Sequence, residues 1–123
     1  MPLAGTVAMR LTTDRLTYRA GEQGAVIARN ESSRIVRLSL GSRQLEQELG
    51  DAWLVRERSP GPGEICTASA MMLPPGATTG ASFRLPRGLR PGVYRWRFFG
   101  IGEQRGAQRG NSERLTNSFG IEA

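Results

Sequence analysis

Apolar side chains in this sequence recur at every second position, in short segments that glycine and proline separate. In the segment VYRWRFF, residues 93–99, the side chains of Tyr94, Trp96 and Phe98 alternate with two arginines. An extended chain directs successive side chains to opposite faces, so we expect a strand with one aromatic and one basic face. The same period of two recurs in the segments 6–12, 24–30, 34–40, 43–49, 53–57, 81–85 and 117–123.

Turn-forming residues divide these segments from one another. Gly50 and Asp51 predict a hairpin turn, and the steps Pro75-Gly76 and Pro91-Gly92 predict type II turns. The segment SPGPGE, residues 59–64, is expected to be a surface loop, and residues 100–114 the longest irregular connection. Helical periodicity is nearly absent. The pattern therefore predicts an all-β fold, an antiparallel β-sandwich of about seven to eight strands.

Length and composition fit one globular domain. The chain has 123 residues, 38% of them hydrophobic and 23% charged, and we expect a single domain over residues 1–123 with the sandwich core at about 6–122. Cys66 is the only cysteine, so no internal disulfide forms, and we expect it to be a small buried apolar residue. No segment approaches the roughly 20 apolar residues that cross a bilayer. No export signal is recognised at the start of the sequence, and Met1 is either a native cytoplasmic start or an initiator methionine placed before a mature region whose export signal was removed.

The residue types present leave little room for catalysis. The sequence has no histidine, which rules out Ser–His and Cys–His pairs and histidine metal ligands. Acidic residues are not clustered in the spacing that calcium loops use. We therefore expect no catalytic residues, no metal and no cofactor, and no enzymatic activity.

Charge is the least ordinary property of the composition. All 17 basic residues are arginines against 11 acidic residues, and the net charge is +6. This balance allows attraction to nucleic acid, anionic lipid headgroups or acidic polysaccharide. The arginines are spread along the whole chain, which favours an arginine-rich surface over a dedicated basic patch. The expected partner is another protein or an acidic polysaccharide, and nucleic acid is not expected.

Two sets of arginines are candidates for partner binding. Arg95 and Arg97 are expected on the outer face of a sheet, where Arg37 and Arg114 on neighbouring strands would join them. This set is either a cationic face that grips carboxylates or phosphates, or a solvated face whose charges Glu46 and Glu48 balance. The second set, in the connection 100–114, contains Arg105 and Arg109. It is either a contact site at the end of the sandwich or an ordinary surface connection.

Residues 89–94, LRPGVY, have the spacing of a tyrosine corner, in which a tyrosine near the start of a late strand hydrogen-bonds back to the preceding corner. Pro91, Gly92 and Tyr94 are the structural residues of this motif. Together with LTTDRLTYRAGE, LPPG and the closing NSFGIEA, the motif makes the chain similar to bacterial immunoglobulin-like domains over about residues 7–122.

The resemblance implies an immunoglobulin-like sandwich of the kind found mostly in exported or surface proteins of bacteria. Such modules act as spacers or adhesion units and lack catalytic residues. The chain lacks the paired cysteines of antibody domains, so Trp53 or Trp96 is expected to fill the centre of the core. A looser resemblance links the chain to the intracellular proteinase inhibitors of bacilli, which share a sandwich of this size and a Pro-Gly turn before a late strand.

We therefore expect a non-enzymatic binding or structural module of a bacterial surface or periplasmic protein, located in the cell envelope or outside the cell. The alternative is a small cytoplasmic proteinase inhibitor or binding protein with a similar sandwich.

Overall fold

The computed structural model describes residues 9–59, 70–103 and 112–123, and these ranges form ten β-strands and no helix. One sheet contains three strands in the order β1 (Met9–Thr13), β3 (Gln23–Asn30) and β7 (Thr78–Arg84). The other contains seven: β2 (Thr17–Arg19), β4 (Val36–Leu49), β5 (Ala52–Ser59), β6 (Met71–Leu73), β8 (Gly92–Glu103), β9 (Ser112–Leu115) and β10 (Phe119–Glu122). The predicted all-β sandwich without a disulfide is confirmed. None of the described segments forms a helix long and apolar enough to cross a membrane.

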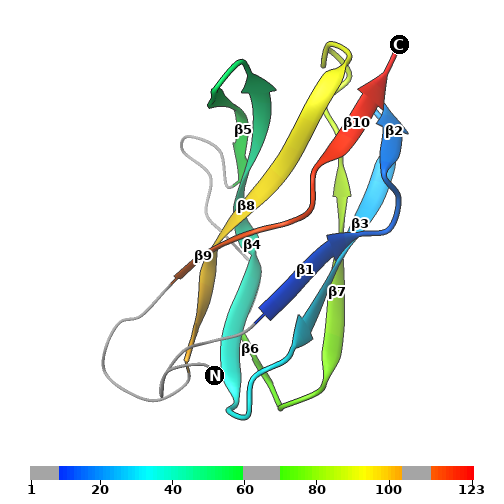
Figure 1. The fold of residues 1–123 in the computed structure, drawn as a ribbon. Helices are drawn as coiled ribbons and strands as arrows, with labels where there is room; N and C mark the ends of the chain where they lie inside the picture. Colours follow the sequence, from blue (N-terminus) through cyan, green and yellow to red (C-terminus); the bar gives the residue numbers. More distant parts are fainter. Residues whose placement is uncertain (1–8, 60–69, 104–111) are drawn as a thin grey trace.

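The two long strands β4 and β8 form the spine of the seven-stranded sheet (Figure 1). They pair antiparallel with each other, and each has two successive partners along its other edge: β5 and β6 for β4, and β9 and β10 for β8. This division of long edges between short strands explains why the strand count is ten rather than seven or eight. A parallel pair, β2 with β10, adds the outermost strand, whereas the other pairs are antiparallel.

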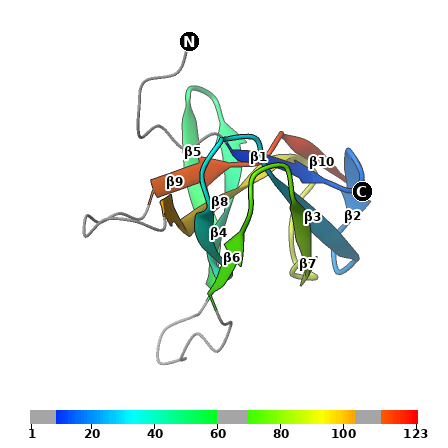
Figure 2. The ribbon, with the colours of Figure 1, turned by 90° about the horizontal axis from the view of Figure 1, so that it is seen from below.

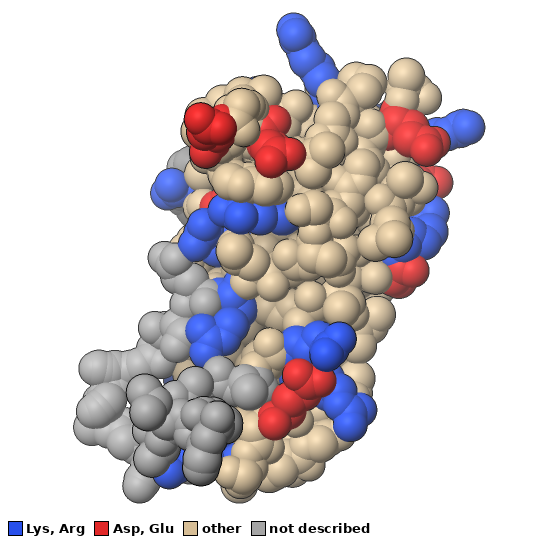
Figure 3. Space-filling view, in the orientation of Figure 1, with Lys and Arg blue, Asp and Glu red and all other residues tan. Residues whose placement is uncertain are grey.

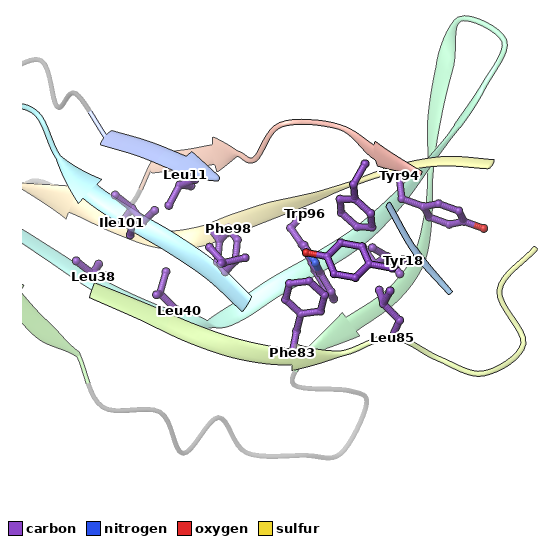
Figure 4. Close-up of a cluster of buried hydrophobic side chains, with 14 of the residues drawn as sticks. Leu11, Tyr18, Leu38, Leu40, Phe83, Leu85, Tyr94, Trp96, Phe98 and Ile101 are labelled. Carbon is purple, nitrogen blue, oxygen red and sulfur yellow. The ribbon is translucent and has the colours of Figure 1, made fainter. Parts of the chain in front are cut away.

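The two sheets face each other as layers, and the core lies between them (Figure 2). The predicted alternation is confirmed in β3, where Val26 and Ala28 are buried, and in β8, where Tyr94, Trp96 and Phe98 are buried. It is not seen in the second half of β4, where four consecutive side chains are buried, or in β5, where none is. Trp96 lies at the centre of the core with 1% of its surface exposed and its ring centroid 5.1 Å from that of Phe83 (Figure 4). Of the two tryptophans expected to fill the centre, Trp96 does so.

Tyr94 forms the hydrogen bond of a tyrosine corner. Its buried ring packs in the core, and its hydroxyl donates to the backbone carbonyl of Arg90 at 2.7 Å. The expected type II turn at Pro91-Gly92 is wrong, because Gly92 has φ 157° and already begins β8, where it pairs with Ile121. A φ of 157° is one that residues with a side chain rarely adopt, so the backbone conformation at this position favours glycine.

The other two predicted turns are confirmed. Pro75-Gly76 forms a type II turn, with Gly76 at φ 78° and a hydrogen bond from the Ala77 amide to the Pro74 carbonyl. Gly50 and Asp51 connect β4 to β5 as a two-residue hairpin turn with Gly50 at φ 62°, which only glycine adopts without strain.

A buried asparagine holds three parts of the chain together. Asn30 is fully buried, and its amide nitrogen donates to the carbonyls of Arg34 and Leu73 at 2.7 and 2.8 Å. Its side-chain oxygen accepts hydrogen bonds from the amide and hydroxyl of Ser32. The triplet Asn30-Glu31-Ser32 matches the N-glycosylation pattern, but a buried amide that already donates twice is not an accessible acceptor for a glycan.

The expected irregular connection at 100–114 is shorter in the structure. β8 continues to Glu103 and β9 begins at Ser112, because the alternating segment runs on past Gly100 and pairs with β4. Several predictions lie outside the described residues: the surface loop from position 60 onward, Cys66, and the candidate arginines Arg105 and Arg109.

Candidate functional site

The outer face of the seven-stranded sheet is the side turned away from the core, and it carries the predicted basic strand face. Buried aromatic residues alternate along β8, so Arg95 and Arg97 between them point outward, as expected. On the neighbouring strand, Glu46 is the register partner of Arg95 and Gln44 is the partner of Arg97. Directly opposed side chains on one face lie close enough to interact.

These four residues form a hydrogen-bonded group, and the ring of Trp53 packs against it; we call the five residues Gln44, Glu46, Trp53, Arg95 and Arg97 the Glu46 cluster. Nε of Arg95 donates to Oε1 of Glu46 at 2.7 Å, and Nε of Arg97 donates to Oε2 at 2.7 Å. The amide nitrogen of Gln44 donates to Oε2 at 2.6 Å. One carboxylate therefore holds two guanidinium groups and one amide in fixed positions.

The Glu46 cluster differs from an ordinary surface ion pair in its burial. The side chain of Glu46 is only 4% exposed, and those of Arg95 and Arg97 are 16% and 23% exposed. Burial alone would raise the pKa of the Glu46 carboxyl, but the hydrogen bonds from Arg97, Gln44 and Arg95 outweigh it and hold the pKa below its ordinary value of 4.5. Glu46 is therefore ionised at neutral pH.

An aromatic ring completes the cluster. The guanidinium carbon of Arg95 lies 3.9 Å from the centre of the Trp53 ring, a cation–π contact between β8 and β5. Trp53 is half-buried on this outer face and takes no part in the core. The ion pair and the ring contact together fix the Arg95 side chain on both sides.

Next to the cluster lies a hollow of about 570 Å³, which we call the outer-face hollow. It lies near two β-bulges, the register shifts between Ser39 and Arg43 in the β4–β8 pair and between Leu45 and Glu46 in the β4–β5 pair. Bulges bend a strand and re-aim its side chains. Three strands line the hollow: β4 (Ser42, Arg43, Gln44 and Glu46), β5 (Trp53, Val55, Arg58 and Ser59) and β8 (Arg97 and Phe99).

A second, more apolar hollow of about 360 Å³ lies between the facing edges of the two sheets. Leu38, Leu40 and Met71 line it from one sheet and Ala81 from the other. Arg43 contributes to both hollows, and its guanidinium carbon lies 5.1 Å from the centre of the Trp96 ring. The Arg43 side chain thus connects the core with the outer face.

Exposed apolar side chains accompany the arginines on the outer face. Val55, Met72, Val93 and Leu115 are exposed although they lie on strands. On the side drawn in Figure 3, the basic side chains form several separate groups rather than one continuous area. The surface is therefore a mixture of apolar, aromatic and arginine side chains, not a uniform cationic patch.

The predicted four-arginine face is only partly assembled. Arg37 points outward, but it lies on the part of β4 beyond the bulge, opposite Met72 and Gly102. Arg114 is the register partner of Phe98, whose side chain is buried, so it belongs to the inner side of the sheet. The predicted outer-face position of Arg114 is wrong. Residues 100–114 were expected to be irregular, so the register in which β9 pairs with β8 was not predicted.

Glu46 is the ion-pair partner of Arg95 and Arg97, as the second interpretation expects, but the three side chains are largely buried rather than solvated. The expected partner Glu48 is exposed and lies opposite Trp53. Sequence reasoning missed Gln44, Arg58 and Phe99 as parts of the site. A signal existed for Phe99, because it is the next outward position of the alternation in VYRWRFF.

The acidic residues near turns serve local contacts. Asp14 accepts hydrogen bonds from the Tyr18 hydroxyl and the Ala25 amide, and Glu31 pairs with Arg10 at 3.0 Å. The described ranges bring together no group of three or more histidine, cysteine, aspartate or glutamate side chains that could hold a metal.

Comparison with known proteins supports the fold. No family profile matches the chain, and no curated protein sequence matches it. Among solved structures, the sporulation control protein Spo0M from Bacillus subtilis is similar with a TM-score of 0.53 and 15% identity, over 94% of this chain and 50% of that one. This chain thus spans about half the length of Spo0M, and at this identity the likeness concerns the fold alone. Two β-glucosidases are more distant. The one from Erythrobacter marinus has a TM-score of 0.45 and 13% identity, over 96% of this chain and 16% of that one. The one from Listeria innocua has a TM-score of 0.41 and 12% identity, over 95% of this chain and 16% of that one.

Proposed function

We propose that this protein is a non-enzymatic, immunoglobulin-like binding module of a bacterial surface or periplasmic protein, and that it contacts its partner through the outer face of the seven-stranded sheet. The partner is another protein or an acidic polysaccharide. The observation that carries the proposal is the Glu46 cluster, a set of hydrogen-bonded charges on a sheet face that no other described element covers.

Rigid placement is what distinguishes this face from a solvated one. Solvated arginines keep their rotamer freedom, which binding would have to remove at a cost of about 0.5–1.5 kcal/mol per side chain. Arg95 and Arg97 have already lost most of that freedom through their bonds to Glu46 and, for Arg95, the contact with Trp53. A partner that meets these side chains therefore loses less entropy on binding.

The composition of the face also supports a contact surface. Tryptophan, phenylalanine, methionine and arginine are enriched at protein interfaces, and Trp53, Phe99, Met72 and Arg58 all lie on or beside this face. The immunoglobulin-like assignment is supported by the hydrogen bond from Tyr94 to Arg90, as in a tyrosine corner, and by the central tryptophan.

The test removes exposed charge without touching the buried cluster. Replacing Arg95 or Arg97 would leave the buried Glu46 carboxylate without one of its ion-pair partners and destabilise the fold. The informative variant is therefore Arg37→Ser with Arg58→Ser, because both side chains are exposed on the outer face. The matched control is Arg29→Ser with Arg87→Ser, which removes the same charge from exposed positions on β3 and in the β7–β8 connection.

Retention on immobilised heparin, an acidic polymer, is measured as a function of salt. The proposal predicts that the outer-face variant elutes at clearly lower salt than the control and shows a weaker dependence of retention on salt, because fewer counterions are released. Equal losses in the two variants would show that only bulk charge acts and would refute the binding face.

A further inference from the structure

We infer that the outer-face hollow binds one acidic sugar unit, a uronate ring, of an anionic polysaccharide. This inference rests on the proposed binding function and assigns a ligand class to one part of the face. It follows from the size of the hollow and from three kinds of group that line it: a guanidinium, hydrogen-bonding groups and aromatic rings.

The hollow has the size and rigidity of a small-molecule site. Its volume of about 570 Å³ lies within the ordinary range for ligand pockets, roughly 300–1,000 Å³. Part of its lining is the hydrogen-bonded chain of Gln44, Glu46 and Arg97, which β4 and β8 hold in register. Because these side chains are already fixed, a ligand meets a preformed surface rather than one that it must order.

Arg58 provides the site for the anionic group. Its side chain is exposed on the hollow, and no described residue forms an ion pair or hydrogen bond with it. A guanidinium presents its N–H groups in a planar fork that matches a carboxylate with two parallel hydrogen bonds. Glu46 is already saturated by the Arg95 and Arg97 side chains, so it does not compete for Arg58.

Gln44 provides an oriented acceptor for a hydroxyl group. Its amide nitrogen donates to Glu46, which fixes the orientation of the amide, and its carbonyl oxygen accepts no hydrogen bond from the described residues. Ser42 and Ser59 line the same hollow. A ligand that carries several hydroxyl groups beside its anionic group can form hydrogen bonds with Gln44 and with these serines.

Phe99 and Trp53 provide flat apolar surfaces in the same hollow. One face of a pyranose ring consists of C–H bonds and packs against an aromatic ring, while its hydroxyl groups point outward to polar side chains. An acidic peptide offers carboxylates but neither this flat face nor a ring of hydroxyls. The combination of Arg58, Gln44 and Phe99 therefore favours a sugar acid over an acidic peptide.

The experiment is calorimetric titration with three soluble probes at one ionic strength: trigalacturonate, its uncharged methyl ester, and hexaglutamate. We expect trigalacturonate to bind at least about tenfold more tightly than either other probe, because only it combines rings with charge. We expect Arg58→Ser to weaken trigalacturonate binding by at least about tenfold and the charge-matched Arg29→Ser to weaken it less than about twofold. Phe99→Leu, which keeps an apolar side chain but removes the ring, should also weaken it severalfold.

Equal binding of hexaglutamate and trigalacturonate, or equal losses in Arg58→Ser and Arg29→Ser, would overturn the inference. Its failure is distinguishable from failure of the proposed function. If heparin retention still depends on the outer-face arginines while trigalacturonate does not bind in the hollow, the binding face stands and only the sugar-acid assignment is lost.

Discussion

Replacing Glu46 by glutamine tests whether the Glu46 cluster is a buried ionic network or a set of incidental surface contacts. The amide keeps the shape of the side chain but removes its charge. One of its two oxygen positions becomes an NH₂ group, which opposes either the Arg95 donor at the Oε1 position or the Arg97 and Gln44 donors at the Oε2 position. At least one hydrogen bond is therefore replaced by opposed donors, and the bonds to the remaining oxygen persist in a weaker, neutral form.

The expected loss of stability follows from the contacts. Each charge-assisted hydrogen bond in the wild type contributes about 1.5–3 kcal/mol, and a buried donor without a partner costs about 1–3 kcal/mol. Arg95 and Arg97 keep limited access to water, which offsets part of the loss. We therefore expect Glu46→Gln to lower the free energy of unfolding by about 2–4 kcal/mol, measured by urea denaturation with circular dichroism. Glu48→Gln, an exposed neighbour on β4, should change it by less than about 0.5 kcal/mol.

The pH dependence provides a second readout of the same cluster. The pKa of the Glu46 carboxyl is lowered in the folded protein, so its stabilisation is fully present above the ordinary value of 4.5 and is lost as the pH falls through the folded pKa. The difference in unfolding free energy between wild type and Glu46→Gln should be constant near neutral pH and shrink below about pH 4.5. A difference below about 0.5 kcal/mol at pH 7, or one that does not shrink in acid, would refute the buried network.

Three further substitutions test the core and its hydrogen bonds by the same denaturation assay. Tyr94→Phe leaves the Arg90 carbonyl without its donor and should cost about 1–3 kcal/mol, and a cost under about 0.3 kcal/mol would contradict the corner bond. Asn30→Asp places a carboxylate against the carbonyls of Arg34 and Leu73 and should cost about 3–5 kcal/mol, which a loss under about 1 kcal/mol would contradict. Gly24→Ala brings a Cβ atom to 2.6 Å from Tyr18 and should cost about 1–3 kcal/mol, whereas Gly88→Ala, with open space around it, should change little.

The core was predictable from sequence because it depends on local periodicity. In a strand, the face of each side chain follows from its position alone, and a buried Trp96 between two outward arginines needs no knowledge of distant residues. The corner hydrogen bond of Tyr94 was predictable for a similar reason, since its partner lies only four residues away.

The Glu46 cluster and the outer-face hollow depend on register between strands, which sequence did not supply. The register shift between Ser39 and Arg43 changes the pairing of β4 with β8, and beyond it Glu46 lies opposite Arg95 and within hydrogen-bond distance of Arg97. Pro91-Gly92 was misassigned because a Pro-Gly step has the same local signal whether the glycine occupies a type II turn or begins a strand with a positive φ. The Glu46 cluster, the outer-face hollow and the start of β8 at Gly92 all depend on contacts between segments that are far apart in the sequence.

The most direct test of the binding face uses the two tryptophans of the chain as paired reporters. Trp53 lines the outer-face hollow, whereas Trp96 is buried in the core, so their indole N–H signals in a ¹H–¹⁵N spectrum report on the two places separately. Trp53→Phe assigns the signals by removing one of them. On titration with trigalacturonate, the account predicts a saturable shift of the Trp53 signal and a stationary Trp96 signal. An unchanged Trp53 signal in the presence of bound ligand, or equal shifts of both signals, would contradict it.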